Sequence, residues 1–216
     1  MTVIAHYKQV PEEARGFSVA LGNFDGVHAG HRAVIDAASA QDARLGVATF
    51  EPPPRAFFRP DDPPFRLYRP ARRNQRLVEL GAQAVFELPF NADMAKMTDE
   101  VFAREVLKEG IGAAHVTVGF DFRFGRGRMG DAARLSSLGR ALGFGVTVVE
   151  KIEALGAKAS STAIREALIS GEPEKAAEIL GHDWIADGIV EHGEKRGRTI
   201  SCREANRAPS FLTMLD

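Results

Sequence analysis

Short apolar runs alternate with segments of helical period along this chain, and this alternation constrains the fold more than any other feature. The runs cover residues 17–21, 45–50, 84–88, 115–119 and 145–149. A strand, a helix and a further strand form a βαβ unit, which requires parallel strands and a right-handed crossover. We therefore predict an α/β fold with a parallel sheet flanked by helices, and we expect ligands beyond the carboxyl ends of the strands.

The helical segments predicted between these strands begin or end at recognisable capping residues. Thr98 is a suitable N-cap for residues 99–110, and Gly81 and Gly181 follow two further segments. The predicted helices cover residues 29–43, 72–80, 99–110, 132–142, 163–171 and 173–181. The pattern is lost from Trp184 onwards, so we predict a first domain over residues 1–183 and a separate segment over 184–216.

Composition sets limits on the partners of the chain. Its 28 basic and 29 acidic residues nearly cancel, so we expect neither a nucleic-acid partner nor a membrane partner. Cys202 is the only cysteine, which excludes an intrachain disulfide and a thiolate metal cluster. The chain starts without a secretory signal pattern and contains no long apolar span, so we expect a cytoplasmic protein. The oligomeric state stays open.

Two histidines stand three residues apart in GNFDGVHAGH, residues 22–31, where a Gly-rich turn is expected to become a helix. His28 and His31 then share one side of a turn whose backbone N–H groups are unpaired, which is a suitable site for the phosphates of a nucleotide. One alternative is a capping turn with exposed histidines. A metal site would need a third ligand, for which Asp25 is the neighbour in sequence, and we predict none.

Residues 119–131, GFDFRFGRGRMGD, contain a formal G-x-G-x-x-G pattern at 125–130. A dinucleotide fingerprint follows its strand directly, whereas the residues DFRF (121–124) intervene here, so an NAD-dependent oxidoreductase would depend on a weak match. Asp121, Arg123 and Phe124 are better interpreted as a loop that offers charge and an aromatic face to a ligand. A turn with solvated arginines is the alternative.

A third polar segment, KASSTAIR at residues 158–165, opens a predicted helix. Ser161 or Thr162 can serve simply as its N-cap. Lys158 and Arg165 flank the same turn, so that hydroxyl groups, unpaired N–H groups and two cations can close over a triphosphate. Both interpretations remain open from the residues alone.

The Pro-rich segment 51–64, EPPPRAFFRPDDPP, is expected to be an irregular loop because proline prevents regular pairing. It contains two adjacent aromatic residues, Phe57 and Phe58. These either belong to the core or provide a surface on which a flat ring stacks.

Four segments in this order, GNFDGVHAGHRAVI, TFEPPPRAFF, VGFDFRFGRGRMGD and KASSTAIREAL, resemble the bacterial bifunctional riboflavin kinase/FMN adenylyltransferases, also called FAD synthetases. The resemblance runs from about residue 17 to residue 199. It implies a Rossmann-like fold of the nucleotidylyltransferase superfamily. It also implies transfer of AMP from ATP to FMN, with Mg²⁺ bridging ATP oxygens and no covalent enzyme intermediate.

The resemblance also implies roles for individual residues. The residues expected to be catalytic are His28, His31 and Arg165. The residues expected to bind ATP are Gly22, Asn23, Phe24, Asp25, His28, His31, Lys158, Ser160, Ser161, Thr162 and Arg165. The residues expected to bind FMN are Phe58, Asp121, Arg123 and Phe124, with the aromatic rings against the isoalloxazine.

The chain departs from the family pattern at three places. Pro53 replaces the histidine of an E-P-H-P motif, and Tyr68 replaces the threonine of F-R-L-T, both on the side expected to bind FMN. Residues 184–200 resemble the opening strand of a riboflavin kinase barrel, but the sequence then departs from the family. One strand cannot close a barrel, so we expect a stub without kinase activity. Two alternatives remain: a different phosphorylated acceptor, or a non-catalytic flavin- or nucleotide-binding fragment.

Overall fold

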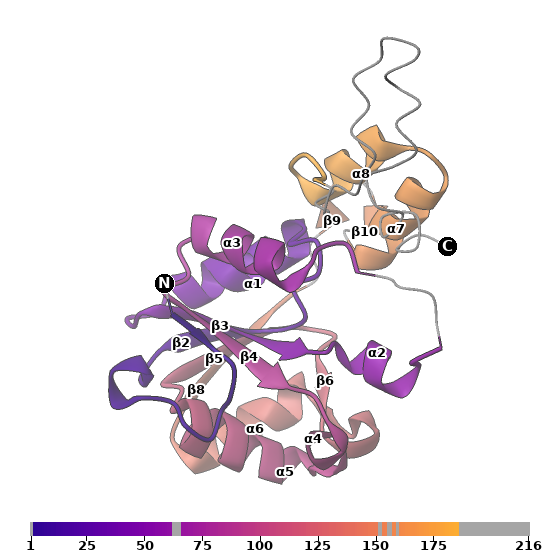
Figure 1. Cartoon of the computed structure of the whole chain (residues 1–216). Coiled ribbons are helices and arrows are strands. Elements are labelled where there is room, and N and C mark those ends of the chain that lie inside the picture. The colour runs from indigo at the N-terminus through magenta and orange to yellow at the C-terminus, as the bar shows by residue number, and fades with distance from the viewer. Residues whose placement is uncertain (1, 62–65, 151–152, 155–156, 159, 186–216) are drawn as a thin grey trace, which may run out of the picture.

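A six-stranded parallel sheet forms the centre of the computed structural model, which describes residues 2–61, 66–150, 153–154, 157–158 and 160–185 (Figure 1). The strand order is β1-β4-β3-β2-β5-β8. The strands are β1 (Thr2–Ile4), β2 (Ser18–Leu21), β3 (Leu45–Glu51), β4 (Ala84–Pro89), β5 (His115–Gly119) and β8 (Gly145–Val149). All five predicted strands and the parallel α/β fold are confirmed. The short strand β1 was not predicted, because three residues are too few to show a pattern.

Helices cover both faces of the sheet (Figure 1). One face carries α1 (Ala29–Ser39) and α3 (Pro70–Glu79), and the other carries α6 (Ala132–Leu142) with α4 (Ala92–Lys96) and α5 (Asp99–Val101). Helix α5 continues into a π-helical segment, η2 (Phe102–Ile111). Thr98 caps α5 as predicted, since its Oγ1 accepts a hydrogen bond from the Val101 N–H at 3.2 Å.

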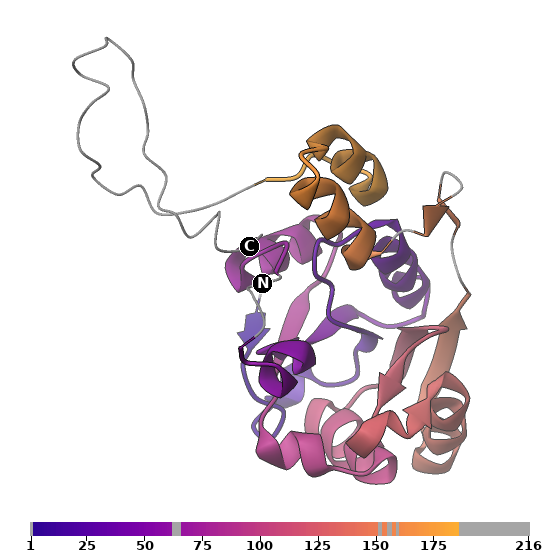
Figure 2. The same ribbon diagram turned by 90° about the vertical axis from the view of Figure 1, so that its right-hand side faces the viewer.

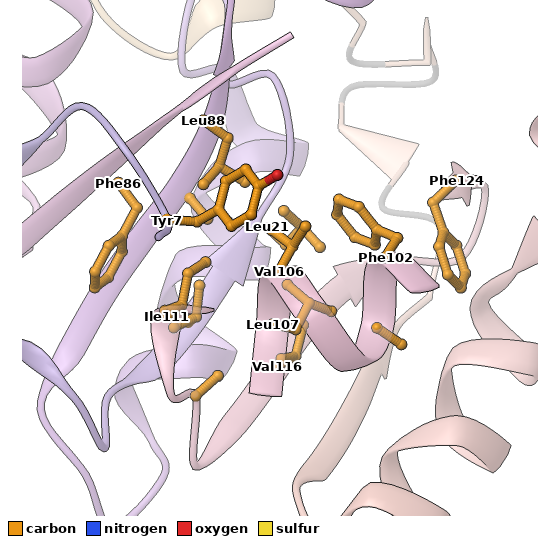
Figure 3. Packing of buried hydrophobic residues seen from close by; sticks show 14 of the residues in the cluster. Tyr7, Leu21, Phe86, Leu88, Phe102, Val106, Leu107, Ile111, Val116 and Phe124 are labelled. Atoms are coloured by element: carbon orange, nitrogen blue, oxygen red, sulfur yellow. The ribbon is translucent and has the colours of Figure 1, made fainter. Parts of the chain in front are cut away.

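Strands β2, β3 and β4 contribute residues to two hydrophobic clusters, one on each face of the sheet. In β4, Val85 packs with α1 and α3, whereas its neighbour Phe86 packs with η2 and α6. Figure 3 shows part of the second cluster, in which Phe86, Val106 and Ile111 lie close together. Because these strands are buried on both faces, their sequences are continuous apolar runs, which is why they could be predicted.

The Pro-rich segment is more regular than predicted. Strand β3 extends to Glu51, which pairs with Pro89 of β4, and residues Pro54–Phe58 form the short helix α2. Pro54 occupies the first helical position. An N–H group at this position makes no intrahelical hydrogen bond, so proline, which lacks one, is well tolerated there. The prediction of an irregular loop across the whole segment was therefore wrong.

Helix α1 is shorter than predicted. It ends at Ser39 rather than at residue 43, and the Gln41 side chain donates to the Ala37 carbonyl at 3.1 Å. This bond satisfies one of the last carbonyls of the helix and lets the chain turn into β3.

The Gly-rich segment 125–130 lies in an antiparallel hairpin. Strand β6 (Arg123–Phe124) pairs with β7 (Gly130–Asp131), and the 3-10 turn η3 (Arg126–Arg128) connects them. A dinucleotide fingerprint joins a parallel strand directly to a helix, so this geometry contradicts that interpretation of the pattern.

Two further helices, α7 (Ser161–Ile169) and α8 (Pro173–Leu180), lie together at one end of the molecule (Figure 2). They follow a small hairpin of β9 (Glu153–Ala154) and β10 (Ala157–Lys158). Leu67 packs with these helices in a third cluster, together with Ile164 and Leu180. Most of the predicted segment 184–216 lies outside the described residues. No helix in the described part of the chain has the length and apolarity needed to cross a membrane.

The order of the strands places two polar loops beside each other. The chain passes from β2 to β3 and β4 on one side, and then returns to β5 and β8 on the other side of β2. At such a change of direction the loops after the two central strands diverge and leave a crevice where ligands bind. The loop after β2 carries the histidine pair, and the loop after β5 carries Asp121.

Candidate functional site

The turn after β2 has an unusual backbone conformation. Phe24, Gly26 and Val27 have φ angles of 50°, 83° and 47°. Positive φ is rare for residues other than glycine, and for a β-branched residue it indicates a turn that its surroundings must hold in place. The Phe24 ring is 1% exposed and anchors the turn in the core. Phe24 was predicted to bind ATP. Because its ring is buried, only its backbone is available for that contact.

The two predicted imidazoles lie against each other at the start of α1. The His28 and His31 rings are stacked, with centroids 3.7 Å apart and planes 20° apart. His28 is the N-cap of the helix, and its Nδ1 accepts a hydrogen bond from the His31 N–H at 3.4 Å. A neutral imidazole that accepts at Nδ1 carries its proton on Nε2. His28 therefore remains a hydrogen-bond donor without a positive charge.

Burial keeps both imidazoles neutral. The pKa of His28 is lowered to about 4, first by burial and then by the charge of Arg165, while Asp121 acts in the opposite direction. Burial, His28 and Arg165 also hold the pKa of His31 well below its usual value. The Nδ1 atom of His31 is buried without a hydrogen-bond partner among the described residues. The charge of Arg165 thus acts on both imidazoles, and the charge of Asp121 acts on His28.

Helix α7 begins beside this turn. Its N-cap is Ser160, whose Oγ accepts from the Ala163 N–H at 3.2 Å, and not Ser161 or Thr162 as proposed from the sequence. Ser161 instead donates from Oγ to the Asp25 carbonyl at 2.9 Å. Thr162 is exposed. The serine that faces the turn is thus free of the capping role, because the residue before it supplies the cap.

Arg165 lies one turn into α7 and forms an ion pair with the same segment. Its Nη2 is 2.6 Å from Asp25 Oδ2, and both side chains are 16% exposed. The structure therefore brings the SST helix and the histidine turn together, as predicted. Lys158 lies in β10 opposite Glu153, and its side chain lies outside what the structure describes.

Gly22 and Asn23, the first two residues predicted to bind ATP, connect the turn to β3. The Gly22 N–H donates to the Ala48 carbonyl at 3.1 Å, and the Asn23 carbonyl accepts from Thr49 Oγ1 at 3.1 Å. The Asn23 side chain is exposed at the carboxyl edge of the sheet. Its predicted contact with ATP stays a prediction.

The predicted aromatic contacts for FMN lie in different surroundings. Phe58 is 63% exposed on α2, with its ring 5.7 Å from that of Phe90. Phe124 is only 6% exposed and packs against Phe102 in the core, 5.7 Å between ring centroids (Figure 3). The interpretation of Phe124 as an exposed aromatic face of the loop is wrong, because the ring points into the core, whereas its predicted contact with FMN stays a prediction.

Phe58 and Phe124 are nevertheless connected by a continuous row of rings. Phe90 is 5.8 Å from Phe50, and Phe50 is 6.2 Å from Phe102, which contacts Phe124. The three intervening residues share no pattern in the sequence, since they come from different elements. Phe50, Phe102 and Phe124 belong to the hydrophobic cluster that packs with η2 and α6, and Phe90 packs against this cluster.

The two charged residues predicted to bind FMN are both exposed. Arg123 lies in β6, and its Nη1 is 3.6 Å from Asp131 Oδ2. Asp121 lies between β5 and β6, where its charge acts on His28. The charge of Asp121 therefore acts on the histidine pair as well as on the side predicted to bind FMN.

A partly buried ionic network that was not predicted from the sequence connects the ends of β3 and β4. Glu51 accepts hydrogen bonds from Arg66 and lies 3.5 Å from Arg73, which binds Glu87 at 2.7 Å. Burial lowers the pKa of Arg73, while the two carboxylates act in the opposite direction. The four charged residues are spread over 36 positions of the sequence and form no local pattern. Only the fold could therefore reveal this network.

Tyr68, one of the departures from the family pattern, also has a defined place. It is buried beside α3, and its hydroxyl is 3.4 Å from His182 Nδ1. Burial raises the pKa of the Tyr68 hydroxyl to about 12. Tyr68 thus contacts His182, just after α8, and the cluster of α1 and α3, and it is not part of the aromatic row. No group of three or more potential metal-binding side chains occurs among the described residues.

A sequence model described as FAD synthetase matches residues 10–163, which include the histidine turn, the aromatic row and the start of α7. The chain belongs to the FAD synthetase family. This family assignment accounts for the order of the four motifs and for the parallel sheet, and the structure places three of the motifs around one turn.

The names of individual similar proteins agree with this family assignment. A bifunctional riboflavin kinase/FMN adenylyltransferase of Escherichia coli K12 is 36% identical over 207 residues, which cover 94% of this chain and 66% of the relative. A Listeria monocytogenes protein named FAD synthetase is 32% identical and covers 90% of this chain and 80% of its own length. The chain thus spans about two thirds of the bifunctional relatives it matches.

A solved structure of similar fold is that of a Streptococcus pneumoniae protein named macrolide-efflux protein. It superposes with a TM-score of 0.80 at 28% identity and covers 93% of this chain and 67% of its own. The similarity therefore extends through α7 and α8 as well as the sheet.

Proposed function

We propose that this chain transfers AMP from ATP to FMN and so produces FAD and pyrophosphate. The observation that carries this proposal is the stacked pair of neutral imidazoles at the start of α1, joined through Asp25 to Arg165 of α7, in a member of the FAD synthetase family. Helix N-termini and buried hydrogen-bond donors are suited to phosphate oxygens.

In the proposed reaction, a phosphate oxygen of FMN attacks the α-phosphorus of ATP. The bond between this phosphorus and the oxygen bridging to the β-phosphate breaks, and pyrophosphate leaves with the electron pair. The attacking phosphate is already an anion, so the step requires no strong base. Rate enhancement then comes from alignment of the two reactants and from stabilisation of the charge on the leaving group.

The chain supplies donors and charge for that leaving group. His28 has its proton on Nε2 while its Nδ1 caps α1, so it can donate to an oxyanion without first taking up a proton. Arg165 adds a positive charge beside both imidazoles. We propose that His28, His31 and Arg165 together hold the phosphates, with Ser160, Ser161, Thr162 and Lys158 at the same end of ATP.

On the acceptor side, we propose that the exposed ring of Phe58 contacts the isoalloxazine, with Asp121 and Arg123 beside it. We also propose that Mg²⁺ accompanies ATP and takes most of its ligands from phosphate oxygens and water, as this ion commonly does. The expected partners are these small molecules and not nucleic acid, and the expected place of the reaction is the cytoplasm. The division at residue 183 remains part of this proposal.

The test is to incubate the purified chain with FMN, ATP and Mg²⁺ and to separate the products by chromatography. Formation of FAD with release of pyrophosphate is the expected result. Binding of FMN and ATP without turnover would identify a non-catalytic fragment, and turnover with a different phosphorylated acceptor would identify another transferase.

A His31→Ala variant tests the role of the imidazole pair in the same assay. Loss of a donor to the developing charge typically raises the barrier by about 2–4 kcal/mol, which is a loss of rate of roughly 30- to 1,000-fold. Circular dichroism establishes whether the variant is folded. A folded variant that keeps the full rate of FAD formation would contradict the assignment.

A further inference from the structure

Asp25 lies at the centre of the site, but its carboxylate is already bound by protein groups. Oδ1 accepts from the N–H groups of Leu67 and Tyr68 at 2.9 and 3.1 Å, and Oδ2 accepts from Arg165 at 2.6 Å. The Asp25 carbonyl accepts from Ser161 at 2.9 Å. A carboxylate has about four positions for hydrogen bonds, and here at least three are used within the protein.

These partners come from parts of the fold that are otherwise separate. Leu67 packs in the cluster of α7 and α8, whereas Tyr68 packs in the cluster of α1 and α3. Ser161 and Arg165 belong to α7. A single aspartate therefore connects the histidine turn, the chain between α2 and α3, and the helix that carries Arg165.

The backbone around Asp25 supports a positioning role. Asp25 stands between Phe24 and Gly26, both with positive φ. A Cβ at Gly26 would lie 2.7 Å from Leu67 Cδ1, so the turn packs directly on the residue whose N–H Asp25 binds. A strained turn persists when its surroundings determine its conformation. The bonds of Asp25 are the polar part of those surroundings.

We propose that Asp25 is a positioning residue for the transfer of AMP, which holds Arg165 against the His28–His31 pair and does not itself bind ATP. This inference deepens the proposed function and rests on it. It changes the role predicted for Asp25 from the sequence, where it counted among the ATP-binding residues. Arg165 and Asp25 are 140 positions apart in the sequence, so their ion pair joins two distant elements of the fold.

The experiment is a double-mutant cycle with Asp25→Asn and Arg165→Ala, measured as kcat and KM for FAD formation. Asparagine keeps an oxygen for the Leu67 and Tyr68 N–H groups and removes the charge that holds Arg165. We expect Asp25→Asn alone to lower kcat at least tenfold, with KM for FMN within threefold of the wild type. In the Arg165→Ala background the same change is expected to cost less than threefold.

A matched control is Lys175→Gln, which breaks an exposed ion pair with Glu172 on α8. We expect its rate to stay within twofold of the wild type. Equal losses from Asp25→Asn in both backgrounds would show that Asp25 acts on ATP independently of Arg165 and would overturn the proposal. A rate for Asp25→Asn within twofold of the wild type would also overturn it.

Hydrogen exchange provides a readout that does not require activity. In Asp25→Asn we expect faster exchange of the α7 amides, with the amides of α6 unchanged. Unchanged exchange in α7 would overturn the positioning role even if FAD is formed. If the wild-type chain forms no FAD, the proposed function fails, and the exchange data still decide whether Asp25 holds α7 to the turn.

Discussion

At the scale of single residues, the site depends on imidazoles that donate hydrogen bonds while neutral. Surface histidines usually titrate near neutral pH, but burial prevents His28 and His31 from doing so. The N-cap hydrogen bond of His28 also determines which ring nitrogen carries the proton. A helix start thereby provides both the unpaired N–H groups and an oriented side-chain donor.

The low pKa of His28 predicts how stability depends on pH. Between pH 6.5 and about 4 the unfolded chain takes up a proton on His28 that the folded chain does not, so the free energy of unfolding falls as the pH falls through this range. The full effect is on the order of 3 kcal/mol, given about 1.36 kcal/mol per pKa unit. Urea unfolding at pH 7 and pH 4.5 measures this difference.

The matched comparison uses His28→Ala and His6→Ala, of which His6 is exposed. The His28 variant is expected to lose less stability between the two pH values than the wild type, while the His6 variant is expected to follow the wild type. An unchanged pH dependence in His28→Ala would contradict the assignment of this effect to His28.

Phe58 and Phe124 allow binding to be separated from stability. Phe58→Ala removes an exposed ring, so we expect KM for FMN to rise at least fivefold with a stability change within about 0.5 kcal/mol. Phe124→Ala removes a buried ring and is expected to cost about 3–5 kcal/mol of stability. Steady-state kinetics and urea unfolding of both variants check this contrast, and an unchanged KM in Phe58→Ala would rule out its stacking role.

At the scale of elements, the sequence predicted those features that depend on neighbouring residues, such as the start of a helix. Thr98 was recognised as the cap of α5 because a threonine before two acidic residues is a standard helix start. The cap of α7 was predicted at Ser161 or Thr162 but is Ser160, since three adjacent hydroxyl residues are all suitable caps and only the path of the chain selects among them. The hairpin at residues 125–130 was likewise decided by packing, not by its glycine spacing.

Two helix caps of the same kind provide a prediction at this scale. Ser160→Ala and Thr98→Ala each remove one side-chain bond to a backbone N–H, so each is expected to cost about 0.5–2 kcal/mol of stability. Helix α5 lies on the opposite side of the sheet from α7 (Figure 1). We expect only Ser160→Ala to lower kcat/KM for ATP by more than fivefold.

Thermal unfolding and FAD formation are measured on both cap variants. A similar loss of activity in both would show that general destabilisation, and not the start of α7, limits the reaction.

At the scale of the whole molecule, the site forms where the sheet changes direction and where α7 and α8 pack onto it. The sheet supplies the turn after β2 and the loop after β5. Helix α7 supplies Ser161 and Arg165, and α7 and α8 contact the rest of the described fold through the third hydrophobic cluster and Asp25. The site is thus completed by contact between two packing units.

Removal of one buried leucine from each unit tests this arrangement. Leu180→Ala in α8 and Leu135→Ala in α6 are each expected to cost about 2–5 kcal/mol, because both side chains are fully buried. Leu180→Ala is expected to weaken ATP binding at least tenfold and to accelerate hydrogen exchange in α7 and α8. Folded Leu135→Ala is expected to bind ATP within threefold of the wild type.

Calorimetric titration with ATP and hydrogen exchange measure the two effects. Unchanged ATP affinity in Leu180→Ala would show that the packing of α8 does not control the site.

The sequence by itself determined the parallel α/β fold and the meeting of His28 and His31. Strands buried on both faces have continuous apolar sequences, and a spacing of three residues places two side chains on one side of a helical turn. Both features depend only on neighbouring residues. Only the tertiary structure decided that Asp25 binds Leu67, Tyr68 and Arg165. These bonds span 42, 43 and 140 positions, so their partners depend on how whole elements pack and leave no pattern along the chain.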